Sequence, residues 1–193
     1  MHSAFMHNQY LLKRQVMALA GKFRIFDPSG QLVFFSKQKM FKLKEDIRIF
    51  SDESMTQELL HIQARQVIDF SAAYDVIDSA TQTKVGALRR KGFRSLARDE
   101  WEILNPNDQI IGILQEDSIG RAILRRLLLG SLLPQNYDLL ISEQKVSEFR
   151  QRFRLFGYHL DLDFSQDTDQ RLDRRLGIAA AILMGTIEGK QKS

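Results

Sequence analysis

The sequence LGIAAAILMGTIEG, from Leu176 to Gly189, decides how this chain folds. Its first twelve residues, up to Ile187, carry no charge, whereas Arg175 precedes them and Glu188 follows them. Twelve helical residues rise about 18 Å, while the hydrocarbon core of a bilayer is about 30 Å thick and needs roughly 20 apolar residues. The length therefore favours a helix buried inside a domain over a helix that anchors the chain in a membrane.

The composition indicates one ordinary globular domain. Of 193 residues, 44% are hydrophobic and 27% are charged. We therefore predict a single domain over residues 1–193, with a core from about residue 10 to residue 189. The absence of Cys excludes disulfides, a thiolate nucleophile and a Cys-based zinc site, and it fits a reducing, cytoplasmic compartment. The net charge of +4 is too small to indicate nucleic acid binding.

Several segments of the chain resemble one another and predict strands. Each contains an aromatic or aliphatic residue that opens a run of alternating apolar and polar side chains, and the run ends near Asp or Asn. This alternation is the period of a β-strand. The opening residues are Phe23, Ile47, Tyr74, Trp101 and Tyr158, with a weaker sixth copy at Tyr137. Turn sequences such as DPSGQ and NPNDQ separate these runs from second strands. The predicted second strands cover residues 31–38, 57–65, 84–91, 110–117 and 145–153.

Two strands in each of six units predict about twelve short strands, and a sheet of that size has to close to avoid exposed edges. A closed barrel of this width needs a plug or a cavity. We therefore predict a mainly β (α+β) fold, in which a closed, roughly twelve-stranded antiparallel barrel encloses the hydrophobic C-terminal helix. That helix is placed from about Thr168 to Glu188, because Asp167 and Asp169 suit a helix N-terminus. One additional surface helix is expected from Ser118 to Gly130.

The chain resembles the LURP-one-related family, in particular its small bacterial-type members. Four segments in order carry the resemblance: FRIFDPSGQLVFFSKQKMFKLKEDIRIF from Phe23, ARQVIDFSAAYDVIDS from Ala64, KVGALRRKGFRSLARDEWEI from Lys84, and RLDRRLGIAAAILMGTIEG from Arg171. The resemblance implies the fold shared by the tubby carboxyl-terminal domain and the phospholipid scramblases, a twelve-stranded barrel around a hydrophobic helix. Tubby domains bind phosphoinositide headgroups through basic surface residues, and scramblases are associated with calcium-dependent lipid movement. For this chain the resemblance implies the fold and leaves the biochemical function open.

The acidic segment before the last helix departs from a calcium site. The scramblase motif has alternating acids and ends in Leu-Asp-Leu-Asp, and here FGYHLDLD keeps only that ending, because Arg152 and Arg154 stand where acids are expected. As an EF-hand loop from Asp161, the sequence has Gln166 at the glycine position and Leu172 at the position of the bidentate Glu. We predict no metal site.

Motifs for catalysis are missing as well. The sequence contains no P-loop, no G-x-G-x-x-G and no G-x-S-x-G motif, and its four histidines are scattered without ligand spacing. We therefore predict no catalytic residue, no cofactor and no enzymatic activity.

A basic segment, KVGALRRKGFRSLAR from Lys84 to Arg98, is the candidate ligand site. Its six basic residues have no acid among them, and strand alternation directs Arg89 and Lys91 to one face and Arg90 to the other. Such cations can hold a phosphate-bearing headgroup through charge-assisted hydrogen bonds. The alternative is an ordinary solvated exterior that is paired with nearby acids such as Asp99 and Glu100. The predicted ligand-binding residues are Arg89, Arg90, Lys91, Arg94 and Arg98.

The predicted helix from Ser118 to Gly130 is a second candidate surface. It combines an apolar stripe with arginines, a pattern that suits a membrane interface or a protein partner and equally suits packing across a barrel wall. The predicted interface residues are Arg121, Leu124, Arg125 and Leu128.

Together these observations predict a non-enzymatic cytoplasmic barrel, peripheral at the membrane, that binds anionic phospholipid headgroups or another phosphorylated ligand. The alternative function is a protein-interaction or structural scaffold. A nucleic acid partner is not expected, and the sequence leaves the oligomeric state open.

Overall fold

Twelve strands and two helices make up the described part of the chain. The structure is a computed structural model, and it describes residues 1–17, 20–39, 46–65, 73–91, 100–116, 136–152 and 157–191. The elements in chain order are η1 (Ser3–Met6), β1 (Gln9–Met17), β2 (Ala20–Phe26), β3 (Leu32–Lys39), β4 (Ile47–Phe50), β5 (Glu58–Ala64), β6 (Ala73–Asp78), β7 (Thr83–Arg90), β8 (Glu100–Leu104), β9 (Ile110–Glu116), β10 (Asn136–Ile141), β11 (Gln144–Arg152), β12 (Tyr158–Asp163) and α2 (Arg174–Gln191).

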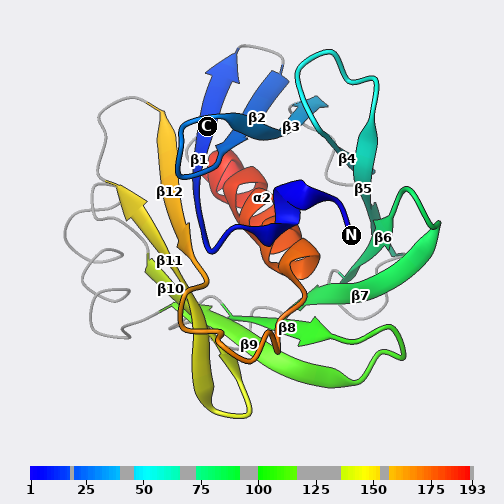
Figure 1. The fold of residues 1–193 in the computed structure, drawn as a ribbon, viewed down its shortest axis with the longest axis vertical. Coiled ribbons are helices and arrows are strands. Elements are labelled where there is room, and N and C mark those ends of the chain that lie inside the picture. The colour runs from blue at the N-terminus through cyan, green and yellow to red at the C-terminus, as the bar shows by residue number, and fades with distance from the viewer. Residues whose placement is uncertain are drawn as a thin grey trace.

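The strands form a closed antiparallel barrel in which each strand pairs with its neighbours in sequence (Figure 1). Closure comes from β1, which pairs with β2 on one side and with β12 on the other, so that Leu12 lies opposite both Ile25 and Leu160. A closed sheet leaves no row of unpaired backbone N–H and C=O groups. The predictions of a mainly β fold, a closed antiparallel barrel of about twelve strands and a C-terminal helix are confirmed.

The strand that closes the barrel was not among the predicted ones. The repeat pattern assigned two strands to each unit, but the unit that opens at Tyr158 supplies only β12, after which the chain turns into α2. The missing partner is β1 at the amino end, whose inward residues Tyr10 and Leu12 are buried. The third inward residue is the charged Arg14, which hides the alternation of β1 from a search for apolar runs.

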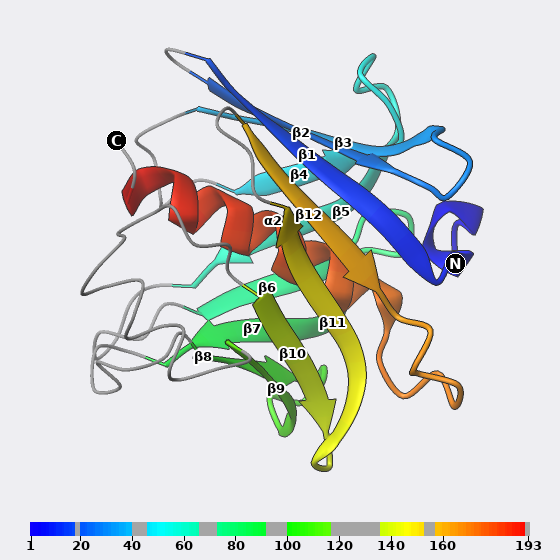
Figure 2. The same cartoon turned by 90° about the vertical axis from the view of Figure 1, so that its left-hand side faces the viewer.

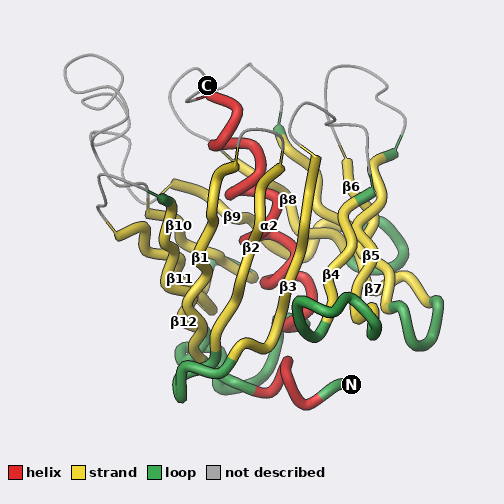
Figure 3. The backbone as a smooth tube through the Cα atoms, turned by 90° about the horizontal axis from the view of Figure 1, so that it is seen from above, coloured by secondary structure: helices red, strands yellow, loops and turns green. Residues whose placement is uncertain are grey.

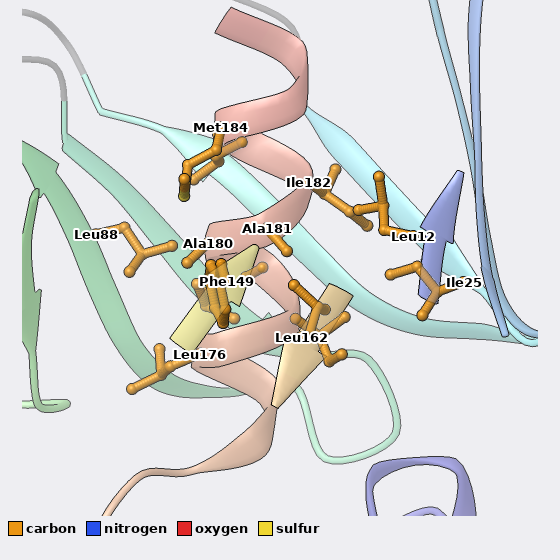
Figure 4. Close-up of a cluster of buried hydrophobic side chains, with 14 of the residues drawn as sticks. Leu12, Ile25, Leu88, Phe149, Leu162, Leu176, Ala180, Ala181, Ile182 and Met184 are labelled. Atoms are coloured by element: carbon orange, nitrogen blue, oxygen red, sulfur yellow. The ribbon is translucent and has the colours of Figure 1, made fainter. Parts of the chain in front are cut away.

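Helix α2 is buried along its apolar segment. Ile178, Ala179, Ala181 and Ile182 have no exposed surface. Figure 1 shows α2 in the middle of the ring of strands, and Figure 3 shows it from the side, running along the strands. Figure 4 shows the side chains of strand residues gathered around it, namely Leu12, Ile25, Leu88, Phe149 and Leu162. Side chains from five different strands thus contribute to one core with the helix.

Two glycines of α2 allow this close packing. A Cβ atom at Gly177 would lie 2.5 Å from the ring of Phe164, and one at Gly185 would lie 2.8 Å from the ring of Phe23. Real Cβ atoms do not approach carbon so closely, so aromatic rings occupy the space that larger helix residues would need. The packing of α2 against these rings therefore requires glycine at both positions.

The helix begins later than predicted. It starts at Arg174, because Asp173 caps it: the Asp173 carboxylate accepts the N–H of Arg175 at 2.9 Å and its carbonyl accepts the N–H of Leu176 at 2.9 Å. Asp167, which was expected to lie at the N-terminus, instead accepts the N–H groups of residues 171 and 172 and thereby folds the preceding turn. The predicted start at Thr168 was wrong for this reason.

Of the helices in the described ranges, none is long and apolar enough to cross a membrane. The predicted surface helix from Ser118 to Gly130 lies outside the described residues.

Candidate functional site

The predicted basic site is centred on the outer face of β7. Arg89 lies opposite Glu102 of β8, and its Nε and Nη2 atoms are 2.6 and 2.5 Å from the Oε2 atom of that glutamate. Lys91 Nζ lies 2.5 Å from Glu100 Oε1 and 3.7 Å from Glu102 Oε1. The hydrogen bond to Glu100 raises the pKa of Lys91 above its usual value. Both cations therefore already have carboxylate partners on the neighbouring strand.

The remaining predicted ligand residues do not join this pair in the described structure. The side chain of Arg90 lies on the opposite face of β7, because successive strand residues alternate between faces. Its neighbours there are Leu88 of the same strand and Trp101, which lies opposite it on β8. Arg94 and Arg98 lie outside the described residues. The structure thus brings together Arg89 and Lys91 and separates Arg90 from them. Ligand binding by these residues stays a prediction.

Charge pairing continues along the outer wall on both sides of β7. Arg65, directly after β5, binds Asp75 of β6 at 2.6 Å, and Lys84 of β7 binds Asp108 in the β8–β9 turn at 2.7 Å. The hydrogen bonds to Asp75 and Asp108 raise the pKa of Arg65. Further along the wall, Lys145 of β11 lies between two acids. Each of these cations has one carboxylate partner on a facing strand, Asp75 for Arg65 and Lys84 and Asp138 for Lys145, as expected for opposite charges on paired strands.

A different arrangement covers β1, β2 and β3, which lie side by side on one side of the barrel (Figure 2). Lys22 of β2 lies directly opposite Lys37 of β3, and Lys13 of β1 lies directly opposite Arg24 of β2. We call Lys13, Lys22 and Lys37 the lysine face. No described carboxylate lies within 4.0 Å of the ammonium group of any of the three.

Sequence reasoning missed the lysine face because its members are not consecutive. Lys22 and Lys37 meet only through the β2–β3 register, and the short run of the sequence around each of them also contains apolar residues. A search for basic runs finds the segment from Lys84 to Arg98 instead. Pairing a strand with its predicted hairpin partner would have placed the two lysines together.

The acidic residues near α2 serve the fold. Asp161 is held by Arg152, with Nε at 2.6 Å and Nη2 at 2.7 Å. Asp163 accepts hydrogen bonds from the Ser165 backbone and hydroxyl. Over the described residues no group of three His, Asp or Glu side chains is placed to hold a metal ion.

Asp167 and Arg174 form the most deeply buried ion pair of the described chain. The Oδ2 atom of Asp167 lies 2.7 Å from Nη1 of Arg174, and their side chains are 0% and 9% exposed. The guanidinium also lies 4.8 Å from the centroid of the Phe164 ring. This ion pair holds the turn that leads into α2, so we assign it a structural role.

The predicted interface residues Arg121, Leu124, Arg125 and Leu128 lie outside the described residues, and the structure does not place them.

The chain was compared with known protein families, curated proteins and solved structures. The model of the family described as LURP-one-related matches residues 32–185, which includes most of the barrel and most of α2. No curated protein and no solved structure matches the chain.

Proposed function

The chain belongs to the LURP-one-related family, and on that premise we propose that it is a non-enzymatic, tubby-like binding module. Its ligands are anionic phospholipid headgroups or other phosphorylated groups, which it binds through basic residues on the outside of the barrel. In this proposal it is a cytoplasmic protein that associates with the membrane from its surface.

The barrel interior supports a role on the outside. In the proposed architecture the barrel encloses α2, and the helix takes the place that a ligand or substrate would need. The burial of Ala181 and Ile182 and the close approach of Phe23 and Phe164 to the helix glycines are in line with this. A catalytic site needs a concave pocket with converging polar groups. The inward residues around the middle of α2 are instead hydrophobic.

The observation that carries the proposal is the distribution of basic side chains on the outer wall. Arg89 and Lys91 are partly exposed, with 37% and 46% of their side-chain surface accessible. Lys37 is exposed as well. Exposed ammonium and guanidinium groups form charge-assisted hydrogen bonds with phosphate oxygens, and they are attracted to anionic bilayers at moderate ionic strength.

Co-sedimentation with lipid vesicles tests this function. We expect the purified protein to pellet with vesicles of phosphatidylcholine mixed with phosphatidylserine, to stay in solution with phosphatidylcholine alone, and to dissociate as salt is raised. Charge reversal at Arg89, Arg90 and Lys91 examines the predicted site directly. Binding that does not increase with the fraction of anionic lipid in the vesicles would rule out the proposal.

The alternative function, docking of a protein partner on the segment from Ser118 to Gly130, concerns residues outside the described ranges. It therefore stays a prediction. Replacement of Leu124 and Leu128 by Ser, with retained folding and loss of a partner, would support it.

A further inference from the structure

We propose that the lysine face is the surface on which the barrel rests against an anionic bilayer. This inference depends on the proposed function, anionic lipid binding, and it moves the contact from the predicted cluster on β7 to the outer side of β1, β2 and β3. The lysine face consists of Lys13, Lys22 and Lys37.

The first argument is that none of the three lysines forms an ion pair with a described carboxylate, although the charge of Lys22 contributes to the lowered pKa of Glu53. Lys22 and Lys37 face each other directly across two strands, a placement in which like charges destabilise the sheet. Lys13 lies opposite another cation, Arg24. On the β7 side, by contrast, Arg89 has Glu102 as its cross-strand neighbour. Much of the barrel wall thus carries paired charges, whereas these three lysines have no described carboxylate partner. Their positive charge is therefore available to an external anion.

The acids close to this face are already engaged. Glu53, in the β4–β5 turn, is bound by Arg24 through two contacts of 2.6 and 3.2 Å. The hydrogen bond from Arg24 lowers the pKa of Glu53. Asp161 of β12 is bound by Arg152 on the side away from β1. Neither carboxylate forms an ion pair with the three lysines. Lys37 is exposed, and Lys13 and Lys22 are half-buried, so that part of each side chain can reach an external partner.

The second argument selects a bilayer over a small anion. The three lysines stand on three adjacent strands, so their stems are spread over roughly 10 Å and do not converge on one point. A single phosphate is best held by donors that converge on it. A charged surface, in contrast, is attracted by cations that are spread over a wall.

The third argument favours lipid over nucleic acid. Leu11 and Phe26 lie opposite each other on the same outer face and are only partly buried. Lys13 Nζ lies 4.7 Å from the centroid of the Phe26 ring. Lysine stems and apolar side chains together suit the boundary between headgroups and acyl chains, where binding grows with both apolar area and charge. The groove of duplex DNA is read by a protruding helix or ribbon, and the lysine face is part of a barrel wall.

The test compares two triple variants of the full chain that change the net charge equally. In the first, Lys13, Lys22 and Lys37 are replaced by Gln. In the matched control, three cations that are bound by carboxylates and are not among the predicted ligand-binding residues, Lys84, Lys145 and Arg152, are replaced by Gln. Binding is measured by flotation with vesicles of phosphatidylcholine, with and without phosphatidylserine, and by titration with duplex DNA at the same salt concentration. Circular dichroism and the thermal midpoint check that each variant is folded.

We expect the unaltered protein to bind only the anionic vesicles. Each lysine near an anionic surface contributes about fivefold to partitioning, so the lysine-face variant should lose on the order of 100-fold. The control should lose no more than about threefold, because its cations are neutralised by bound acids. Should Lys13 prove necessary for folding through its contact with Phe26, replacing Lys22 and Lys37 alone should still cost on the order of 20-fold.

The remaining outcomes separate the two proposals. Loss of vesicle binding in the control with retention in the lysine-face variant overturns this inference and leaves lipid binding in place. Failure of the unaltered protein to bind anionic vesicles overturns both. Tighter binding of DNA than of vesicles, abolished in the lysine-face variant, overturns the choice of a bilayer.

Discussion

Ala181 of α2 and Lys37 of β3 belong to two regions that are organised by different forces. Ala181 is fully buried among aliphatic and aromatic side chains, where fit decides the free energy. Lys37 is exposed and lies opposite another lysine, where only the charges of neighbouring strands matter. The inside of the barrel is therefore intolerant of changes in volume or charge. Its outside can lose or gain single charges at small cost in stability, which is what a binding surface needs.

The largest effect on stability is expected from a charged side chain placed inside the barrel. Ala181→Asp should destabilise the protein by about 4 kcal/mol or more, because a carboxylate would be buried among apolar groups without a partner. Gln15→Asp, on the exposed side of β1, is the control and should change stability by less than about 1 kcal/mol. Urea unfolding followed by circular dichroism measures both. Equal effects would show that position 181 is not buried.

A smaller effect is expected when one half of the buried ion pair is removed. Arg174→Ala leaves Asp167 buried without its cation and should cost about 3–5 kcal/mol. The matched change at an exposed pair, Arg152→Ala, should cost less than about 1 kcal/mol, because Asp161 stays hydrated. If the two variants unfold at the same urea concentration, the buried ion pair between Asp167 and Arg174 does not stabilise the fold.

The buried hydroxyl of Tyr10 predicts a weaker effect that depends on pH. Its hydroxyl donates to the Ala4 carbonyl at 2.8 Å, and burial raises the pKa of Tyr10 to about 12. A raised pKa in the folded state gives stability that is complete below the usual value near 10 and is lost as pH rises toward 12. Tyr10→Phe should lose about 1 kcal/mol at neutral pH and should show less alkaline destabilisation. An unchanged pH profile in the variant would contradict this.

The smallest effect is expected on the outer wall. Lys22→Glu places an acid opposite Lys37 and should stabilise the protein by a few tenths of a kcal/mol at low salt, with the gain disappearing at high salt. Lys84→Glu is its counterpart, and it should destabilise, because Lys84 contacts Asp75 and Asp108. Thermal midpoints at two salt concentrations decide the sign. A loss of stability in Lys22→Glu would mean that the lysine pair is not repulsive.

The same contrast explains how far the sequence could be interpreted. The charge-free segment from Leu176 to Ile187 and the alternation after residues such as Phe23 and Trp101 were enough to predict the barrel and its helix, since burial depends on patterns within one element. Strand β1 was not predicted, because the charged Arg14 interrupts the apolar residues on its inward face. The helix start was misplaced because Asp167 uses its carboxylate to fold a turn.

The outer wall was harder to predict. The basic run from Lys84 to Arg98 drew attention because its cations are consecutive, yet Arg89 finds its partner Glu102 thirteen residues away. Lys22 and Lys37 become neighbours only through strand register. Whether a cation is paired depends on the facing strand, and a single run of sequence does not contain that information.

Thiol labelling tests most directly the claim that α2 fills the barrel and that only the outer wall is open to partners. The chain has no Cys, so Ala181→Cys and Lys37→Cys each introduce a single thiol. Under native conditions the thiol at position 37 should react with a maleimide at the rate of an exposed cysteine, while the thiol at position 181 should react only as fast as the protein unfolds. Equally rapid labelling of both positions in folded protein would contradict the account.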